Sequence, residues 1–317
     1  MSLSPVRADT PTAARSVPDF PAIAPAIDTI GVLSARPERP SALVVVDWRA
    51  PWWKRIRSRV AMSPESVSAW AAARGGRVVV YVHGAGTSAD RAVRQGATLA
   101  RRGGHRGATV VIPWPTHALG VTWPRSRAGL AQGYVDDSLA AVSSDSVVHT
   151  RLARLAQAVP PESVVVLAHS LGARLVTRVL SGAPLRAPIG TVALLAGDVG
   201  VTEFTRDLAP ALRRATRRPV IYVGRGDRML WLSRMRHDES RIGEARSAGM
   251  MASAGVEVVD AGALPLRGAL FRALGTRHAV TRLDGAVADL FGPVLQGTPR
   301  QAVTDSAGVI RLTRPRR

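Results

Sequence analysis

The sequence predicts an α/β fold in which helices cover both faces of a doubly wound, mostly parallel sheet. Apolar runs of strand length recur along the chain and are continuous and rich in valine, which is typical of parallel strands buried on both faces. Segments with helical spacing of apolar residues separate these runs. The expected strands cover residues 42–48, 78–82, 109–112, 164–168, 191–195, 220–223 and 256–259.

Helices are indicated wherever apolar residues recur three and four positions apart. The clearest examples lie at residues 92–99, 152–159, 171–180, 204–212 and 283–294. In an open sheet of this kind, functional residues gather at the carboxyl ends of the strands. The residues that follow each strand are therefore the first place to look for chemistry.

The 317 residues are enough for one large domain or two smaller ones, and the hydrophobic content of 46% indicates a globular protein. Residues 1–40 are rich in proline, alanine, serine, threonine and arginine without any period. We expect them to form a mostly disordered N-terminal extension. The main domain is expected over residues 41–298, and residues 299–317 are expected to form a basic tail.

The chain carries a net charge of +20, and Lys54 is its single lysine. Such an excess can attract nucleic acid or an anionic membrane surface. The arginines are scattered and aromatics make up only 4% of the chain, which does not favour nucleic-acid binding. An anionic membrane surface remains open as a partner. Trp52 and Trp53 lie beside a basic cluster and form either a surface-binding patch or, as we expect, a loop tucked against the domain.

No apolar run approaches the roughly 18 residues that span a bilayer. The N-terminus is interrupted by prolines and aspartates and lacks the apolar core of a signal peptide, so a cytoplasmic location is expected. The absence of cysteine excludes disulfides, thiolate metal sites and a cysteine nucleophile. The sequence does not indicate an oligomeric state.

Residues 164–175, VVVLAHSLGARL, place Ser170 where a strand changes into a helix. The motif differs from G-x-S-x-G only at its first position, where Ala168 replaces glycine. A nucleophile elbow needs small residues on both sides of the serine because the helix packs close to the strand. Ala168 and Gly172 meet that need, with His169 adjoining the serine. The alternative is an ordinary helix-capping serine.

The order of residues along the chain favours a catalytic triad. A serine hydroxyl needs an imidazole to take its proton and a carboxylate to orient that imidazole. In α/β hydrolases the order is serine, acid, histidine. His278 is the late histidine that precedes the final amphipathic helix. Asp227 and Asp198 both follow strands; Asp227 is the expected acid, and Asp198 is expected to cap a helix or to support the triad.

The stretch HGAG at residues 83–86 fits an oxyanion hole, which requires backbone N–H groups directed at the developing alkoxide. The expected donors are the N–H groups of Ala85 and Leu171, with His83 and Gly84 as supporting residues. The alternative is a phosphate-binding loop. The chain lacks both G-x-G-x-x-G and a Walker lysine at this point, which argues against nucleotide binding.

These segments together resemble an uncharacterised bacterial family of α/β hydrolases. The resemblance covers about residues 77–292 and includes His-Gly after one strand, Trp-Pro after the next, A-H-S-L-G at the elbow and D-R-M-L after a later strand. It implies an α/β-hydrolase fold with Ser170 as nucleophile, Asp227 as acid and His278 as base. The family often has an aromatic residue two positions after the histidine, whereas this chain has Val280.

The sequence therefore predicts a serine hydrolase that cleaves an ester or related acyl bond of a small molecule, without a metal or organic cofactor. Segments 115–147 and 228–254 are expected to border the pocket and to favour an apolar acyl group. They contain Trp123, Tyr134, Met229, Leu230 and Trp231, which could equally belong to the core. The alternatives are a non-catalytic binding protein on the same fold and a basic surface-binding protein.

Overall fold

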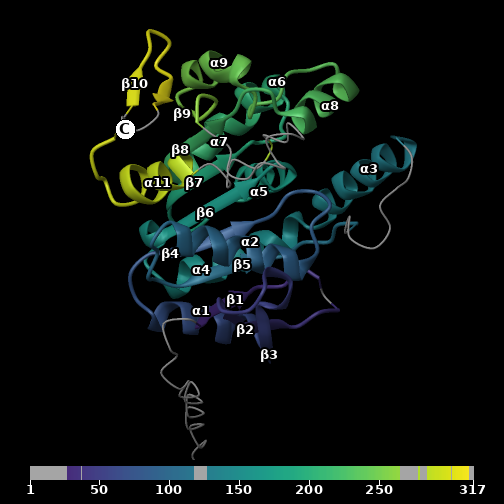
Figure 1. Ribbon diagram of the computed structural model, residues 1–317, viewed down its shortest axis with the longest axis vertical. Coiled ribbons are helices and arrows are strands. Elements are labelled where there is room, and N and C mark those ends of the chain that lie inside the picture. Colours follow the sequence, from purple (N-terminus) through teal and green to yellow (C-terminus); the bar gives the residue numbers. More distant parts are fainter. Residues whose placement is uncertain are drawn as a thin grey trace, which may run out of the picture.

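The computed structural model of the chain describes residues 27–36, 38–117, 127–264, 278, 284–300 and 302–313. Within these ranges the strands form one sheet, in the order β10-β11-β9-β8-β7-β6-β4-β5-β1-β2-β3 (Figure 1). The first expected strand corresponds to β2, and the six that follow it correspond to β4–β9. The strands are β1 Ile27–Val32, β2 Ser41–Asp47, β3 Ile56–Met62, β4 Val78–Val82, β5 Thr109–Ile112, β6 Val164–His169, β7 Ile189–Leu195, β8 Thr216–Val223, β9 Glu257–Asp260, β10 Ala302–Thr304 and β11 Ile310–Leu312.

The five expected helices are confirmed, and the structure adds others where the apolar spacing is weak. Two of the expected helices contain a π-helical turn, at Phe204–Leu208 before α7 and at Leu290–Val294 after α11. The helices are α1 Pro64–Ala73, α2 Ala89–Arg102, α3 Arg127–Ser143, α4 Asp145–Ala158, α5 Leu171–Gly182, α6 Val201–Glu203, α7 Ala209–Ala215, α8 Arg228–His237, α9 Ala248–Ser253 and α11 Asp284–Asp289.

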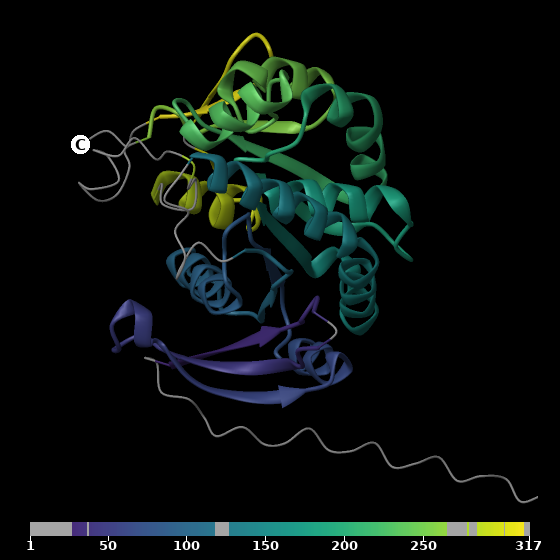
Figure 2. The ribbon, with the colours of Figure 1, turned by 90° about the vertical axis from the view of Figure 1, so that its right-hand side faces the viewer.

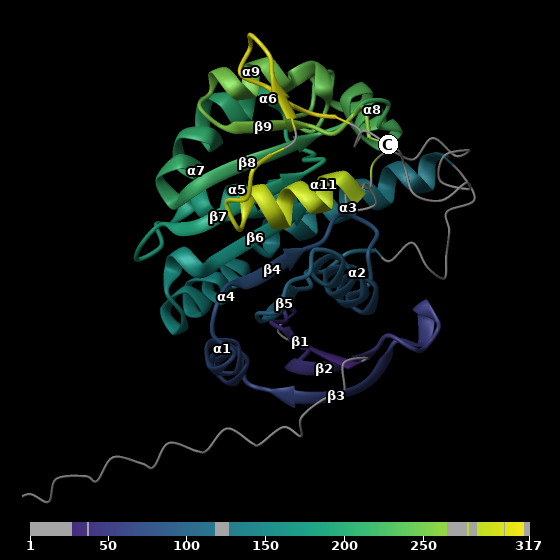
Figure 3. The same cartoon turned by 60° about the vertical axis from the view of Figure 1, so that its left-hand side comes forward.

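The central strands are parallel and buried on both faces. β4 pairs with β5 and β6, and β6, β7, β8 and β9 pair in succession, all in parallel. Alternate residues of β4 enter two different apolar clusters. One cluster contains residues of α1, α4, α5 and α7, and the other contains residues of α2 and α11. Figure 3 shows α2 and α11 on the near face of the sheet. The predicted doubly wound α/β fold is confirmed.

The structure differs from the expected boundaries at both ends of the chain. β1, which lies within the expected extension, pairs antiparallel with β2 and parallel with β5. The hairpin β10–β11 lies within the expected tail, and β11 pairs with β9. Figure 2 shows these two additions at opposite ends of the sheet. Backbone hydrogen bonds to distant strands hold both additions, so local composition did not reveal them. The expected disorder of residues 1–26 lies outside the described residues.

The turn between β2 and β3 also differs from expectation. Trp52 and Trp53 lie in a short 3₁₀ helix, and the Trp53 side chain is 69% exposed. The expectation that both tryptophans tuck against the domain is therefore wrong. Arg94 lies over the Trp52 ring, 4.7 Å from its centroid, which covers one of the two rings. None of the helices in the described ranges has the length and apolar character needed to span a bilayer.

Candidate active site

Ser170 lies on a sharp turn between β6 and α5. Its backbone has φ 54° and ψ −123°, a conformation that a non-glycine residue adopts only under strain. A Cβ added at Gly172 would lie 2.3 Å from the carbonyl oxygen of His83, so only glycine permits α5 to start this close to β4. The Ser170 side chain makes no capping bond to α5. The capping interpretation is therefore wrong.

The structure brings Ser170, His278 and Asp227 together from three distant parts of the chain. The Ser170 Oγ lies 2.7 Å from Nε2 of His278. The Nδ1 atom of the same ring lies 2.8 Å from Oδ2 of Asp227. Both distances fall within hydrogen-bond reach. With Nδ1–H donating to the carboxylate, Nε2 is free to accept the serine proton.

Asp227 is held from two sides. It follows β8 and caps α8, where its Oδ1 accepts hydrogen bonds from the N–H groups of Met229 and Leu230 at 3.0 and 3.1 Å. Its Oδ2 faces His278. Burial alone would raise the pKa of this carboxyl, but the neighbouring imidazole and the hydrogen bonds outweigh it and lower that pKa. Asp227 is therefore a carboxylate at neutral pH.

The electrostatics of His278 follow from the same contact. Burial of the ring disfavours its protonated form, and the adjacent Asp227 carboxylate favours that form. The carboxylate prevails, so the pKa of His278 is raised above its ordinary value of 6.5. Asp198 contributes in the same direction through its charge. A base with a raised pKa is well matched to proton transfer near neutral pH.

Asp198, the other candidate acid, binds a different set of partners. Its Oδ2 accepts a hydrogen bond from the Tyr134 hydroxyl at 2.9 Å, and its Oδ1 accepts one from the Ser233 hydroxyl at 2.6 Å. The buried Arg241 guanidinium lies 3.2 Å from the same Oδ1. Asp198 does not cap the following helix, where Gly200 is the capping residue and no side chain caps. Asp198 thus links α3 and α8 beside the triad.

The HGAG turn packs directly against the nucleophile elbow. A Cβ added at Gly84 would lie 2.8 Å from the Cβ of Ser170. His83 is stacked on Trp114, and its Nε2 accepts a hydrogen bond from the Trp114 N–H at 3.2 Å. Burial lowers the pKa of His83 to about 4, so the ring is neutral and structural. In the described part of the chain, the N–H groups of Ala85 and Leu171 donate to no protein acceptor.

Asp137 is a site residue that sequence reasoning missed. Its carboxylate is buried and accepts a hydrogen bond from the Gly86 N–H at 2.7 Å and another from the His117 N–H at 2.6 Å. It therefore fixes the HGAG turn to α3 and to the segment after β5. No sequence signal indicated this role, because Asp137 lies in the middle of a helix and follows no strand.

His169 contacts the backbone of the candidate base. Its Nε2–H donates to the backbone carbonyl of His278 at 2.9 Å, and the two rings lie 4.9 Å apart. Burial, reinforced by the neighbouring His278, lowers the pKa of His169 to about 4. The ring therefore stays neutral near pH 7. This contact spans 109 positions of the chain.

Of the residues expected to border a pocket in segments 115–147 and 228–254, only some lie near the candidate active site. Tyr134 in α3 reaches Asp198, but Leu230 is fully buried in the core. Met229 and Trp231 are exposed on α8. Trp123 lies outside the described residues.

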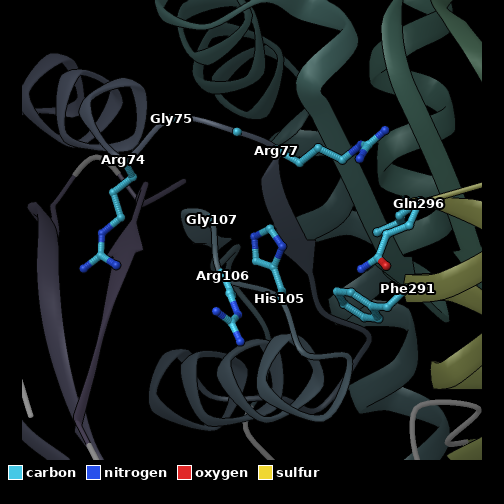
Figure 4. Close-up of a pocket in the computed structure, with 10 residues that line it drawn as sticks. Arg74, Gly75, Arg77, His105, Arg106, Gly107, Phe291 and Gln296 are labelled. Atoms are coloured by element: carbon cyan, nitrogen blue, oxygen red, sulfur yellow. The ribbon is translucent and has the colours of Figure 1, made fainter. Parts of the chain in front are cut away.

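Two pockets lie at the opposite edge of the sheet, near the amino ends of β4, β5 and β6. One has a volume of about 370 Å³ and is lined by Arg74, Arg77, His105 and Arg106 among others. The second, of about 530 Å³, adjoins it at residues 75–77. Figure 4 shows the three arginine side chains of the first pocket pointing away from one another. Their charges do not converge on one anion, and no residue of the Ser170 site lines either pocket.

Comparisons with known proteins identify the family to which the chain belongs. A family model described as an alpha/beta hydrolase of unknown function (DUF900) matches residues 65–270. The chain belongs to this family. The matched range includes Ser170 and Asp227 and ends before His278. The predicted α/β-hydrolase fold and the resemblance to an uncharacterised α/β-hydrolase family are thereby confirmed. A comparison with curated proteins gave no match.

Solved structures similar to this member of the family include several esterases. EstE1, a thermostable carboxylesterase from a metagenomic library, is 16% identical, with 84% of this chain and 88% of that chain covered and a TM-score of 0.39. A carboxylesterase from Mesorhizobium loti is 17% identical, with 60% and 81% covered and a TM-score of 0.37. The ydeN gene product from B. subtilis is 15% identical, with 58% and 84% covered and a TM-score of 0.36. At these levels of similarity they carry no argument about substrate.

Proposed function

We propose that the chain is a serine hydrolase that cleaves an ester or related acyl bond through an acyl-enzyme intermediate. The observation that supports it most is the continuous hydrogen-bond chain from Ser170 Oγ to His278 Nε2 and from His278 Nδ1 to Asp227 Oδ2. A non-catalytic protein on this fold has no need to keep all three groups aligned.

In the proposed reaction, Ser170 Oγ attacks the acyl carbonyl while its proton passes to Nε2 of His278. The oxygen of the tetrahedral intermediate accepts hydrogen bonds from the N–H groups of Ala85 and Leu171. His278 then donates its proton to the leaving alcohol, and the C–O bond to that alcohol breaks. Water, deprotonated by His278, hydrolyses the acyl-enzyme and restores the serine hydroxyl.

The surrounding residues act in this proposal by holding geometry. Asp227 fixes the tautomer and orientation of His278 and stabilises the imidazolium that forms. Asp137 holds the HGAG turn through Gly86, which keeps the Ala85 N–H in position. His169 holds the backbone of His278. None of these three touches the substrate carbonyl.

The test is labelling of the serine by a fluorophosphonate probe, followed by mass spectrometry of the labelled peptide. We expect wild type to be labelled at Ser170, and both Ser170→Ala and His278→Ala to lose labelling. Ser181→Ala is a matched control, since Ser181 lies in the same helix and bonds only the carbonyl of Thr177. This control should label as wild type does. A panel of esters with increasing acyl length would then define the substrate.

The proposal is overturned by a folded wild-type chain that neither reacts with excess probe nor hydrolyses any ester of the panel. Labelling at another serine, unchanged in Ser170→Ala, would equally contradict it. Thermal unfolding of each variant confirms that lost labelling does not reflect a lost fold.

A further inference from the structure

The outward face of α8 carries three large apolar side chains beside the exposed Arg228. Trp231, Leu232 and Met235 are 48%, 51% and 59% exposed, whereas Leu230 and Ser233 on the opposite side are buried. Met235 lies four residues after Trp231 and three after Leu232, so the three side chains lie on one side of the helix. A helix on the surface of a globular protein ordinarily presents polar residues outward. Here the apolar outward face calls for a partner that covers it.

The charge of the same helix is positive. α8 contains three arginines and no acidic residue, and Asp238 follows it at the C-cap. Arg234 is paired with Glu244 at 3.4 Å, while Arg236 is exposed. The chain as a whole carries +20. An apolar face bordered by arginines complements a surface that is apolar inside and anionic at its boundary.

The position of α8 connects this face to the candidate active site. The helix begins directly after Asp227, which contacts His278. It also contacts α3, because the Tyr134 hydroxyl lies 3.2 Å from the Ser233 hydroxyl and the Tyr134 ring meets the His237 ring edge-on. Figures 1 and 3 show α3 and α8 on the same side of the molecule. Leu139 and Val142 of α3 are exposed as well.

We propose that the outward face of α8, formed by Trp231, Leu232 and Met235, docks on the surface of an anionic lipid bilayer. Tryptophan lies at the headgroup level of a membrane, leucine and methionine enter the acyl boundary, and arginine attracts lipid phosphate. A second part rests on the proposed function: the ester cleaved at Ser170 belongs to a lipid drawn from that surface. The docking itself does not require catalysis.

A second exposed tryptophan offers an internal comparison. Trp53, between β2 and β3, is more exposed than Trp231 and lies beside the basic residues Lys54 and Arg55. Arg94 lies over the ring of its neighbour Trp52, which is still 42% exposed, and the turn contains no leucine, isoleucine, valine or methionine. It also has no contact with the triad. The proposal therefore assigns docking to α8 and none to Trp53.

The experiment uses the full chain carrying Ser170→Ala, so that vesicle lipid is not consumed. Binding is measured by co-sedimentation with vesicles of phosphatidylglycerol and phosphatidylcholine and with vesicles of phosphatidylcholine alone. We expect binding to the anionic vesicles, weakened about 100-fold or more when Trp231, Leu232 and Met235 are all changed to serine. Arg236→Gln should weaken binding about fivefold. Trp53→Ser is the matched control and should bind as the parent does.

The docking is overturned if the parent chain does not bind anionic vesicles, or if the triple variant binds as tightly as the parent. Loss of binding in Trp53→Ser alone would place the contact at the other tryptophan and also overturn it. If light scattering shows a dimer that the triple variant converts to a monomer, and no vesicle binding occurs, a second copy covers α8 instead. Probe labelling of wild type is measured separately, so a failed docking and a failed hydrolase proposal remain distinguishable.

Discussion

Two buried carboxylates, at the ends of neighbouring strands, have opposite surroundings. Asp227 after β8 and Asp198 after β7 are both almost wholly buried. Asp227 faces a titratable imidazole on one oxygen and two backbone N–H groups on the other. Asp198 faces the permanently charged guanidinium of Arg241 together with two hydroxyl groups.

The comparison shows that the partner, more than burial or strand position, separates a candidate catalytic acid from a structural one. A carboxylate beside an imidazole can stabilise the charge that appears on the ring during reaction. A carboxylate already neutralised by arginine and bonded to hydroxyls holds its neighbours in place. Here the two hydroxyl groups belong to α3 and α8, and Arg241 lies in the segment after α8.

The largest difference between the two carboxylates is expected in catalysis. Asp227→Asn keeps the cap of α8 but removes the charge beside His278, and kcat for ester hydrolysis should fall about 10,000-fold. The matched variant Asp198→Asn should lower kcat by less than about tenfold, because Asp198 does not touch the reacting atoms. Steady-state kinetics on the best ester of the panel measures both. If kcat falls by similar factors in the two variants, the distinction fails and Asp198 is again a candidate for the catalytic acid.

The second difference is expected in stability, where Asp198→Asn should have the larger effect of the two variants. Asp198→Asn leaves the buried Arg241 without its closest carboxylate and should lower the free energy of unfolding by about 3 kcal/mol. Urea denaturation measures this change. Asp207→Asn is the control, since Asp207 forms an exposed pair with Arg206 and its loss should leave stability unchanged. Equal stability of Asp198→Asn and wild type would show that the contacts of Asp198 with Arg241, Tyr134 and Ser233 do not stabilise the fold.

Much of the candidate site could be predicted from the sequence because its residues follow strands. Ser170 and Asp227 come directly after apolar runs, and parallel strands bring their carboxyl ends to one edge of the sheet. His278 was identified from its order in the chain and its place before the last helix. The sequence distinguishes the two candidate acids less clearly, because Asp198 and Asp227 each follow a predicted strand.

The parts that were missed depend on contacts between distant residues. β3 alternates arginine with small and apolar residues and is exposed along most of its length, so no apolar face marks it as a strand. β10 and β11 are three residues each, too short for a period to emerge. Asp137 lies within α3 and acquires its role only when the helix meets Gly86, 51 positions away. Such pairings are properties of the assembled fold.

The smallest expected effect is a shift in the pH dependence of kcat/KM when Asp198 is changed. His278 must be neutral to accept the serine proton, so kcat/KM falls as pH drops through its pKa, which lies above 6.5 because the Asp227 carboxylate outweighs burial. The Asp198 charge raises the same pKa to a lesser extent. Asp198→Asn removes that charge and should move the acidic limb to lower pH.

The control for this shift is Tyr134→Phe, which removes a hydrogen bond to Asp198 while leaving its charge in place. Its acidic limb should coincide with that of wild type, since the charges of Asp227 and Asp198 near His278 are both unchanged. A limb that moves to higher pH in Asp198→Asn would contradict the assigned sign of the interaction. A limb that moves equally in both variants would show that the network acts by positioning His278, because only one of the two variants changes the charge.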